Sequence, residues 1–524
     1  MAHVRTMQAD MNWFGVLAHR ATIEPDKAIT VFEGETTTYG EMAARATALA
    51  SGLSERGVGR GNVVALLSYN SPEFLETVFA ANYLGAIAMP INWRLAASEV
   101  RYILEHSGAY CMVCDEPHID LANEATNGIE GALVRACVSP GAVHGWTTLD
   151  ELRAAPSSAE RVPAAADDIH RLMYTSGTTG RPKGVMITHA NLAWKNMAHI
   201  IEFGFTGSDL GLACGPLNHV GALDLTTTSL IAAGATTIVH RTFEASAVVD
   251  ELERSRVTTV WLAPAMVNAM MALPDIEQRD LSSVRVIING GEKMPLPLLE
   301  RIQRLFPSAW FADAYGLTET VSGDTFLDRD SLVRKIGSVG RPCLYVELDI
   351  WDEQGRSLSP GERGEIVLRG PKVCAGYWRD PEATAAAFAG GWFHTGDVGV
   401  RDEDGYLYIV DRFKDMIVSG GENIASSEIE RVLYEHSSVL EAAVVGRPDD
   451  RWGEVPVAFV VLRDSFASGT KLAEELCGYV ADRLTHYKQP REVRFVDEVP
   501  KTASGKILRR ELRKILGSPL SPIP

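Results

Sequence analysis

The sequence of 524 residues is poor in cysteine and has no long uninterrupted apolar run. Its seven cysteines are odd in number and scattered in position, so a disulfide framework is not expected. The one CxxC pair, Cys111 and Cys114, lies in the run AYCMVCD, which predicts a buried strand with structural thiols instead of a metal or redox site. No segment approaches the roughly 18 apolar residues that a membrane-spanning helix needs, so no membrane span is expected.

Positive charge is also scarce. The chain has 50 lysines and arginines against 68 aspartates and glutamates, which gives a net charge of −18. Proteins that bind nucleic acids or anionic membranes present basic surfaces, so neither partner is expected here. The N-terminus lacks an apolar segment followed by a small-residue cleavage site, and the C-terminal SPIP is not a peroxisomal signal. We therefore expect a cytoplasmic protein, and the sequence leaves a homodimer open.

Apolar strands alternate with helices through most of the chain. Residues 63–68 and 85–90 predict buried strands, and residues 71–83 between them predict a helix with Ser71 as N-cap and Pro72 as its first residue. Further units of the same kind follow. This alternation indicates an α/β protein with parallel sheets.

The pattern changes after about residue 338, where short alternating strands are separated by turn signals such as those at 352–355 and 404–405. They predict a small β-barrel or an antiparallel sheet. A new α/β unit begins at about residue 412. We therefore predict an N-terminal region, 1–411, of βαβ-type subdomains plus a small β-barrel, followed by a small mobile C-terminal α/β domain, 412–524.

The run MYTSGTTGRPKGV at residues 173–185 is the first segment that indicates a specific chemistry. Its hydroxyl-bearing residues and glycines are Thr175, Ser176, Gly177, Thr178, Thr179 and Gly180. The glycines allow backbone N–H groups to approach an anion closely, and Lys183 adds a positive charge. The run follows a short strand and precedes a helix capped around Thr188 and Asn191. We interpret it as a polyphosphate-binding loop; it is not a Walker A loop, because GxxxxGK[ST] is absent. The alternative is a flexible turn.

The loop resembles the signature of the acyl-adenylate-forming superfamily, which contains acyl-CoA synthetases, aryl-CoA ligases, peptide adenylation domains and beetle luciferases. Six further motifs resemble those of the superfamily in the same order. They are NGGE (289–292), YGLTET (315–320), WFHTGDVG (392–399), DRFKD (411–415), SGGENIASSEIE (419–430) and PKTASGKILR (500–509). The resemblance extends from about residue 20 to 513, and the surrounding sequence is most similar to bacterial fatty-acyl and feruloyl-type CoA ligases.

The resemblance implies a two-step reaction. A carboxylate attacks the α-phosphate of ATP to give an acyl-adenylate and pyrophosphate, and the thiol of coenzyme A then displaces AMP. The expected cofactors and co-substrates are ATP, Mg²⁺ and coenzyme A. The first step brings two anions together, so cations and a metal ion must neutralise them.

The superfamily motifs imply roles for individual residues. The implied catalytic residues are Lys506, Lys183, Glu319, Thr318 and His219. The implied ATP and AMP contacts are Thr175, Ser176, Gly177, Thr178, Thr179, Gly180, Gly290, Gly291, Glu292, Tyr315, Gly316, Thr318, Asp397, Arg412 and Lys506. Glu319 and Thr175 are the implied metal ligands.

Within this set, the resemblance assigns each group a part of the nucleotide. Tyr315 and the backbone at Gly290–Gly291 should enclose the adenine, and Asp397 should accept from the ribose hydroxyls. Arg412 should reach the ribose and phosphate. Lys506 should bridge the substrate carboxylate and the α-phosphate.

The small domain carries the implied coenzyme A site. Lys414 matches the hinge about which this domain rotates between the two steps. The implied coenzyme A contacts are Ser419, Gly420, Gly421, Glu422 and Trp452, with Arg447, Arg451 and Lys488 as candidate phosphate partners.

The implied acyl pocket lies beside residues 216–222, 266–270 and the segment after YGLTET. Its candidate residues are His219, Val220, Gly221, Met266 and Gly291. Gly221 and Ala222 are expected to leave room for a large acyl group. Asp224 and Asp324 are the formal charges in these stretches, which contain no Lys or Arg. A dicarboxylic acid, which would want a second cation, is therefore disfavoured. By the resemblance, His219 occupies the place of the aspartate with which peptide adenylation domains hold an α-amine, and Asp224 is expected further along the helix, so an amino acid is disfavoured too. An apolar monocarboxylic acid is expected, either an aryl or phenylpropenoic acid or a medium-to-long-chain fatty acid.

Two other functions remain as alternatives. The first is a freestanding adenylating enzyme that loads a carrier protein; the sequence contains no carrier segment, so a separate carrier would be expected. The second is a catalytically silent nucleotide-binding module, against which the complete set Lys183, Glu319, Asp397, Arg412 and Lys506 argues.

Overall fold

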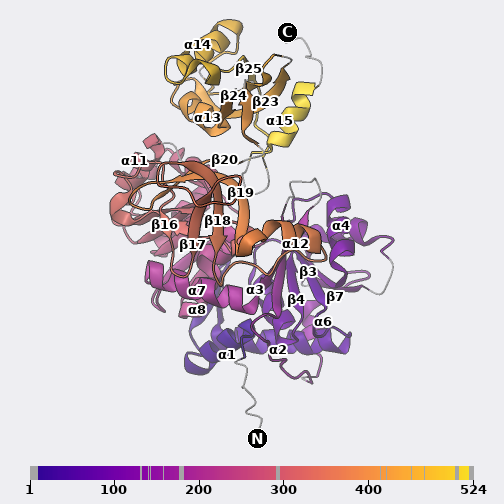
Figure 1. Ribbon diagram of the computed structural model, residues 1–524. Coiled ribbons are helices and arrows are strands. Elements are labelled where there is room, and N and C mark those ends of the chain that lie inside the picture. Colours follow the sequence, from indigo (N-terminus) through magenta and orange to yellow (C-terminus); the bar gives the residue numbers. More distant parts are fainter. Residues whose placement is uncertain are drawn as a thin grey trace, which may run out of the picture.

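The computed structural model has a large N-terminal region below a small C-terminal domain (Figure 1). It describes residues 10–129, 133–139, 141, 143–156, 158–175, 182–290, 296–412, 415–419, 422–449, 451–464, 466–501 and 507–517. The large region contains two sheets with their helices and a separate antiparallel sheet, which agrees with the predicted α/β fold class.

The first sheet has seven strands in the order β7-β6-β5-β3-β4-β8-β9. The strands are β3 (Val63–Leu67), β4 (Ile87–Pro90), β5 (Ala109–Asp115), β6 (Val134–Val138), β7 (Thr147–Thr148), β8 (Ile169–Thr175) and β9 (Lys183–Thr188). Its helices are α2 (Tyr39–Glu55), α3 (Pro72–Tyr83), α4 (Ala97–Ser107), α5 (Ile119–Thr126) and α6 (Leu149–Arg153). Strands β3 to β8 run parallel, as predicted, because helices connect consecutive strands. The Ser71 hydroxyl caps α3, and Pro72 is its first residue, as predicted.

Strand β9 was not predicted. The sequence suggested that the glycine-rich loop leads directly into a helix, but β9 pairs antiparallel with β8 before α7 (His189–Phe203) begins. The buried side chains of Val185 and Ile187 alternate along β9, which is the period of a strand. The predicted capping of α7 by Thr188 and Asn191 is present.

The second sheet has nine strands in the order β16-β15-β14-β13-β12-β10-β11-β1-β2. They are β1 (Ala28–Phe32), β2 (Glu35–Thr38), β10 (Leu210–Ala213), β11 (Thr236–Val239), β12 (Thr259–Leu262), β13 (Val286–Gly290), β14 (Trp310–Tyr315), β15 (Thr325–Phe326) and β16 (Arg341–Pro342). Its helices include α8 (Thr228–Ala233), α9 (Ala245–Arg254), α10 (Pro264–Met271) and α11 (Leu296–Leu305). A π-helical turn, η2 (Gly221–Thr227), leads into α8.

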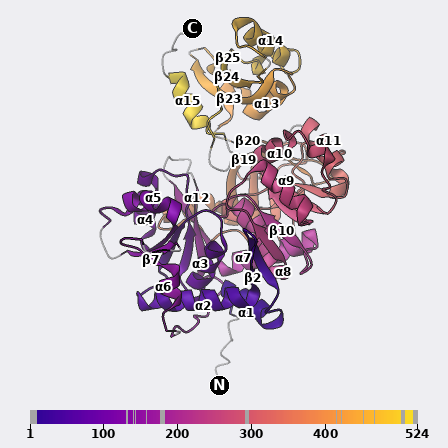
Figure 2. The same cartoon turned by 180° about the vertical axis from the view of Figure 1, so that it is seen from behind.

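The two sheets of the large region, each with its helices, lie side by side (Figure 2). One buried apolar cluster contains residues of both, such as Leu49 of α2 and Ile231 of α8, and it also packs against α1 (Trp13–Ile23). The shared core joins the two sheets into one region. The Cys111 and Cys114 side chains are buried in β5, as predicted, and burial raises the pKa of the Cys111 thiol to about 12.

A four-stranded antiparallel sheet follows, with the order β17-β18-β19-β20 and the helix α12 (Pro381–Ala387). The strands are β17 (Glu347–Trp351), β18 (Arg363–Arg369), β19 (Phe393–Arg401) and β20 (Leu407–Arg412). In the described part of the chain β17 and β20 do not pair, so this unit is an open antiparallel sheet. The prediction of a small β-barrel is therefore wrong here, and the antiparallel sheet considered beside it is the form that the structure has.

The small domain has its own sheet and core. Its strands are β21 (Ile417–Ser419), β22 (Glu422–Ile424), β23 (Val439–Asp449), β24 (Gly453–Leu462) and β25 (Glu492–Phe495), and its helices are α13 (Ser426–Tyr434), α14 (Thr470–Ala481) and α15 (Arg509–Gly517). Separate apolar clusters lie on the two faces of β23 and β24. Strand β20 ends at Arg412 and β21 begins in a different sheet, close to the boundary that was predicted between 411 and 412.

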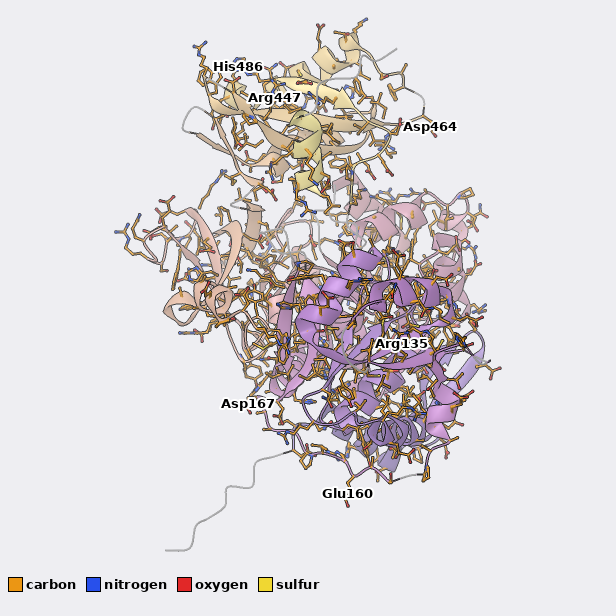
Figure 3. All side chains as sticks on the ribbon, turned by 90° about the vertical axis from the view of Figure 1, so that its right-hand side faces the viewer. Arg135, Glu160, Asp167, Arg447, Asp464 and His486 are labelled. Atoms are coloured by element: carbon orange, nitrogen blue, oxygen red, sulfur yellow. The ribbon has the colours of Figure 1, made fainter. Side chains whose placement is uncertain are left out.

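Contacts between the small domain and the large region include an ion pair of 3.1 Å between Arg363 and Glu428. Charged side chains project from both parts: Figure 3 labels Arg447, Asp464 and His486 on the small domain, with Arg135 and Glu160 on the large region. None of the helices in the described ranges combines the length and apolarity that crossing a bilayer requires.

Candidate active site

The loop end of the β8–β9 hairpin carries two of the predicted site residues. Thr175 ends β8 and Lys183 begins β9, and the two are direct cross-strand partners. Helix α4 contacts this end of the hairpin: the Tyr102 hydroxyl donates to the carbonyl of Pro182, the residue before Lys183, at 3.3 Å. Thr175 and Lys183 are therefore brought together. Ser176, Gly177, Thr178, Thr179 and Gly180 lie outside the described residues.

The predicted adenine contacts lie at the carboxyl ends of two neighbouring parallel strands. β13 ends at Gly290 and β14 at Tyr315, and Gly290 pairs with Ala314. A Cβ at Gly290 would lie 2.8 Å from the Ala314 carbonyl oxygen, so only glycine fits at this position. Carboxyl ends of parallel strands are where ligands bind in open α/β sheets. Gly291 and Glu292 lie outside the described residues.

Asp397 and Tyr315 are joined by a hydrogen bond, in which the Tyr315 hydroxyl donates to Asp397 Oδ2 at 2.8 Å. Burial, followed by the nearby Asp397 carboxylate, raises the pKa of the Tyr315 hydroxyl well above its ordinary value, so it remains a donor. Asp397 is itself 4% exposed and is the cross-strand partner of Arg412, which ends β20. Tyr315 of β14, Asp397 of β19 and Arg412 of β20, all predicted to bind adenosine, thus lie at one corner of the large region.

Glu319 lies next to this corner, in the short helix η4 (Thr318–Thr320) that follows β14. The turn before it passes Gly316, where a Cβ would lie 2.3 Å from the backbone nitrogen of Gly323. Glu319 Oε1 accepts a hydrogen bond of 2.9 Å from the Tyr377 hydroxyl, and Lys183 Nζ lies 4.9 Å from the centroid of the Tyr377 ring. Sequence reasoning missed Tyr377, whose position after the apolar run of β18 gave no sign of this contact.

The donor set around Glu319 fits magnesium bound together with a nucleotide. Among the described residues, no group of three or more His, Cys, Asp or Glu side chains could hold a metal ion by themselves. Mg²⁺ is usually bound through one or two carboxylates plus phosphate oxygens instead of an all-protein cage. One carboxylate, Glu319, with hydroxyl oxygens at Thr318 and Thr175 in the same region is consistent with that chemistry.

The segment after η4 adopts a left-handed backbone at three consecutive residues, with φ of 55° at Val321, 64° at Ser322 and 63° at Gly323. This conformation is uncommon for a β-branched residue. The buried Lys372 Nζ donates to the Ser322 and Gly323 carbonyls at 2.7 and 2.6 Å and pairs with Asp324 at 2.9 Å. Lys372 therefore stabilises this segment and neutralises the Asp324 carboxylate.

Of the predicted acyl-pocket residues, Val220 and Met266 are buried, in two different apolar clusters, and the His219 ring lies 6.2 Å from the Trp261 ring of the cluster that contains Met266. His219 Nδ1 accepts from the Gly221 N–H at 3.0 Å. The expectation that Gly221 leaves room for the acyl group is wrong, because a Cβ there would lie 2.5 Å from the Trp261 indole. Trp261, which the sequence analysis did not single out, fills that space and forms an aromatic wall beside His219.

Asp224 lies in η2 and is fully buried. It forms an ion pair with Arg171, and Lys195 Nζ lies 4.0 Å from its carboxylate. Lys195 also donates to the hydroxyl of Thr228 at 2.7 Å. Both acidic side chains in the predicted pocket stretches are thus paired with buried cations, Asp224 here and Asp324 with Lys372.

Comparison with known proteins identifies the family. The AMP-binding enzyme family matches residues 17–378, and the AMP-binding enzyme C-terminal domain matches residues 428–506. This chain belongs to the AMP-binding enzyme family. The predicted superfamily, its multi-domain α/β fold and the assignment of the chain as an enzyme are therefore confirmed.

Three relatives illustrate the similarity. The chain is 40% identical over 499 residues to a feruloyl-CoA synthase of Amycolatopsis, covering 95% of this chain and 98% of that protein. It is 37% identical over 509 residues to the long-chain-fatty-acid–CoA ligase FadD13 of Mycobacterium tuberculosis, covering 95% and 97%. The structure of o-succinylbenzoate coenzyme A synthetase from Bacillus subtilis in complex with ATP and magnesium ion superposes with a TM-score of 0.84 at 33% identity, covering 96% and 99%.

In this AMP-binding enzyme the described members of the predicted coenzyme A set, Ser419, Glu422 and Trp452, lie together at one end of the strands β21, β22 and β24 of the small domain. Ser419 pairs with Glu422 in the β21–β22 hairpin and with Gly453 at the start of β24, next to Trp452. The Trp452 side chain is exposed, and the Arg451 guanidinium lies 4.9 Å from its ring centroid.

The other predicted residues of the small domain are placed differently. Arg447 pairs with Glu492 and Lys488 pairs with Glu428, so two of the three candidate phosphate partners already have carboxylate partners within the domain. Lys414, Gly420, Gly421 and Lys506 lie outside the described residues.

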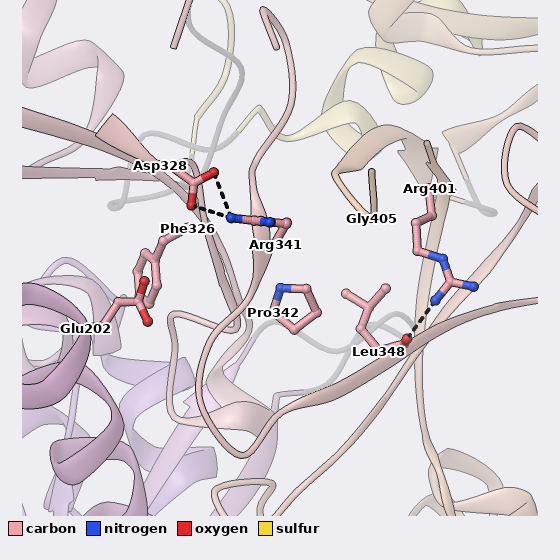
Figure 4. A pocket seen from close by; sticks show the side chains of 8 residues that line it. All are labelled: Glu202, Phe326, Asp328, Arg341, Pro342, Leu348, Arg401 and Gly405. Atoms are coloured by element: carbon pink, nitrogen blue, oxygen red, sulfur yellow. Dashed lines mark hydrogen bonds and ion pairs between the residues drawn. The ribbon is translucent and has the colours of Figure 1, made fainter. Parts of the chain in front are cut away.

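A pocket of about 450 Å³ lies elsewhere in the AMP-binding enzyme, between the end of α7 and the antiparallel sheet (Figure 4). Its lining residues are Glu202, Phe326, Asp328, Arg341, Pro342, Leu348, Arg401 and Gly405. Arg341 pairs with Asp328 across one wall at 3.1 Å. None of the predicted site residues lines it, so it is not the predicted active site.

Proposed function

We propose that this AMP-binding enzyme is an ATP-dependent acid–CoA ligase whose substrate is an apolar monocarboxylic acid, with an aromatic or phenylpropenoic acid as the preferred class. The observation that carries the proposal is the meeting of Tyr315, Asp397, Arg412, Glu319 and the Thr175–Lys183 hairpin in one place. The set offers an adenosine site beside a cation and a metal-binding carboxylate. A nucleotide bound there would have its phosphates at the hairpin.

Adenosine binding follows from the strand ends. The Tyr315 ring is fixed by its hydroxyl's bond to Asp397 and offers a stacking face, while the close backbone at Gly290 offers the other. The Asp397 carboxylate can accept from the ribose hydroxyls, since a carboxylate has about four acceptor positions.

In the first step the substrate carboxylate oxygen bonds to the α-phosphorus while the bond to pyrophosphate breaks. Lys183 lowers the repulsion between the two anions, and the Thr318 hydroxyl donates to the α-phosphate. When bound at Glu319, Mg²⁺ supplies further neutralisation of the phosphate charge. Lys506, by its motif, bridges the reacting carboxylate and the α-phosphate.

In the second step the coenzyme A thiol gives up its proton and attacks the acyl carbonyl carbon. The thioester bond forms as the bond to AMP breaks. The proposed surface for coenzyme A is the end of the small-domain sheet that contains Ser419, Glu422 and Trp452. Rotation of the small domain about Lys414 would bring this surface to the acyl-adenylate.

The nature of the acid follows from the charges and rings near His219. Asp224 and Asp324 are both paired with buried cations, so neither of these carboxylates is available to an α-amine. The flat indole of Trp261 beside His219 favours an aromatic acid, because offset or edge contacts between rings add about 0.5–1.5 kcal/mol to area burial. The similarity to a feruloyl-CoA synthase supports the same class. The similarity to a fatty-acid ligase keeps the aliphatic class as the alternative.

The test is to incubate the protein with ATP, Mg²⁺ and coenzyme A and one of ferulate, benzoate, octanoate or palmitate, and to follow AMP, ADP and pyrophosphate. We expect AMP and pyrophosphate in equal amounts, coenzyme A-dependent turnover, and the highest kcat/KM with an aromatic acid. ADP formation would contradict the scheme. A preference for palmitate would replace the aromatic class by the aliphatic one.

A further inference from the structure

Residues 372–378 form a connecting segment between the phosphate hairpin and Glu319. On one side this segment pairs with β9: the Trp378 N–H donates to the Gly184 carbonyl at 2.7 Å, and the Ala375 N–H donates to the Met186 carbonyl at 3.0 Å. The Met186 N–H donates back to the Gly376 carbonyl at 2.9 Å. The segment therefore extends the hairpin by one more short strand.

On its other side the segment contacts η4. The Cys374 N–H donates to the Glu319 carbonyl at 2.7 Å, and the Tyr377 hydroxyl donates to Glu319 Oε1 at 2.9 Å. The Tyr377 ring also lies beneath Lys183, with Nζ 4.9 Å from its centroid. One side chain thus contacts both the lysine and the carboxylate that the proposed function assigns to the ATP phosphates and the metal.

We propose that Tyr377 is a positioning residue that holds Glu319 and Lys183 in the geometry needed to bind ATP with Mg²⁺. This inference rests on the proposed function for the identity of the site, but it does not depend on which acid is used.

The physical argument concerns freedom of rotation. A glutamate carboxylate and a lysine ammonium are both carried on flexible stems, so each needs an outside contact to fix it. The Tyr377 hydroxyl fixes one oxygen of Glu319, and its ring attracts the ammonium electrostatically. Hydrogen-bond partners of metal-binding carboxylates commonly set metal affinity in this way.

The backbone pairing of the segment does not involve the hydroxyl. Loss of the hydroxyl alone should therefore leave the fold intact. Tyr377→Phe removes the bond to Glu319 and keeps the ring beneath Lys183, while Tyr377→Leu removes both. Tyr83→Phe is a matched control, because the Tyr83 hydroxyl donates to the backbone carbonyl of Ala159 at 3.1 Å, away from the site.

The experiment measures ATP binding to the full-length protein by calorimetry across a Mg²⁺ titration, without acid or coenzyme A. We expect Tyr377→Phe to raise the half-saturating Mg²⁺ concentration about 10-fold. Its ATP affinity without Mg²⁺ and its thermal unfolding curve should match those of the wild type. Tyr377→Leu should also weaken Mg²⁺-free ATP binding, and Tyr83→Phe should change neither.

An unchanged Mg²⁺ dependence in Tyr377→Phe would overturn the inference. So would an equal loss of ATP affinity with and without Mg²⁺, which would mean that the hydroxyl has only a structural role. The proposed function fails separately, if wild-type protein binds ATP with Mg²⁺ but makes no AMP from any acid.

Discussion

Asp397 and Arg412 are direct cross-strand partners in the antiparallel strands β19 and β20, and Arg412 is the last residue of its strand. Asp397 is tied on its other side to Tyr315 of β14. The proposed adenosine site is therefore built at the point where the large region ends and the chain continues into the small domain. This placement links the binding of a nucleotide to the position of the small domain.

Asp397 provides the sharpest test of the ribose assignment. Asp397→Ala should raise the KM for ATP about 10- to 100-fold, since hydrogen bonds to a charged group are worth about 1.5–3 kcal/mol. Wild-type enzyme should discriminate between ATP and its 2′- or 3′-deoxy analogues, and the variant should not. Asp404→Ala, at an exposed turn carboxylate, is the control. Retained discrimination in Asp397→Ala would remove the residue from the ribose site.

Lys506 is assigned by its motif to the first half-reaction. Lys506→Ala should slow acyl-adenylate formation by at least about 10²–10³-fold, the range for loss of one transition-state donor. Thioester formation from supplied acyl-adenylate should be spared. Pyrophosphate release and thioester formation are measured separately, with Lys514→Ala, at an exposed lysine, as control. An equal fall in both half-reactions would contradict the role.

Lys372 should be important for stability. Its ammonium contacts two carbonyls and Asp324 in a fully buried setting. Lys372→Met should lower the free energy of unfolding by about 3–5 kcal/mol, because it leaves an uncompensated buried carboxylate. Adding Asp324→Asn should restore part of the loss. Urea unfolding tests this, with Lys514→Met expected to change stability by less than about 0.5 kcal/mol; a fully additive double variant would argue against the pairing.

Trp261 is expected to limit the size of the acid. Trp261→Leu removes part of the ring that fills the space beside Gly221 and His219. The kcat/KM for a bulky acid such as ferulate, divided by the kcat/KM for benzoate, should rise about 10-fold. Space for one or two more methylene groups in an apolar pocket changes such a ratio by about this much. Trp310→Leu, in β14 and bonded to the Leu327 carbonyl, is the control. An unchanged ratio would move the acyl group away from Trp261.

Buried histidines predict loss of stability in acid. The pKa values of His170, His189 and His199 are lowered, mainly because these side chains are buried. The pKa of His189 is lowered to about 4. Between that value and the ordinary value of about 6.5 the unfolded chain binds more protons than the folded one. The free energy of unfolding should therefore fall as pH drops below about 6.5, by up to about 1.4 kcal/mol per pH unit for each histidine.

The measurement is urea unfolding at pH 7.5 and 5.5. His199→Asn should make the decrease smaller, and the exposed His144→Ala should not. An identical decrease in His199→Asn and the wild type would mean that His199 is not the source.

Some of the site could be predicted from sequence because its residues mark strand ends. Thr175, Gly290 and Tyr315 are each the last residue of a strand, and the ends of parallel strands meet at one edge of a sheet. The helix from Pro72 to Tyr83 was also predictable, since its N-cap and first residue are local signals. The hairpin strand β9 was not, because six residues after a glycine-rich loop give too short a pattern.

The remaining features depend on contacts between distant segments. The Tyr377 hydroxyl reaches Glu319 from 58 residues away, and the pairing of Lys372 with Asp324 crosses between separate elements. The prediction that Gly221 leaves space for the acyl group was wrong. The glycine has no side chain there because the Trp261 ring approaches its backbone closely. A sequence pattern indicates which positions lack a side chain but not which neighbour fills the gap.

The small domain keeps separate apolar clusters on both faces of β23 and β24. Its described links to the large region include the Arg363–Glu428 ion pair and a hydrogen bond from Ser427 to the Val410 carbonyl. The two parts also share a small apolar cluster of Val398, Val410 and Ala425, but this cluster is separate from the main apolar clusters of either part. All-or-none unfolding is a property of chains whose parts share one core. Heat should therefore melt this protein in two transitions, and a single melting temperature would describe neither part of it.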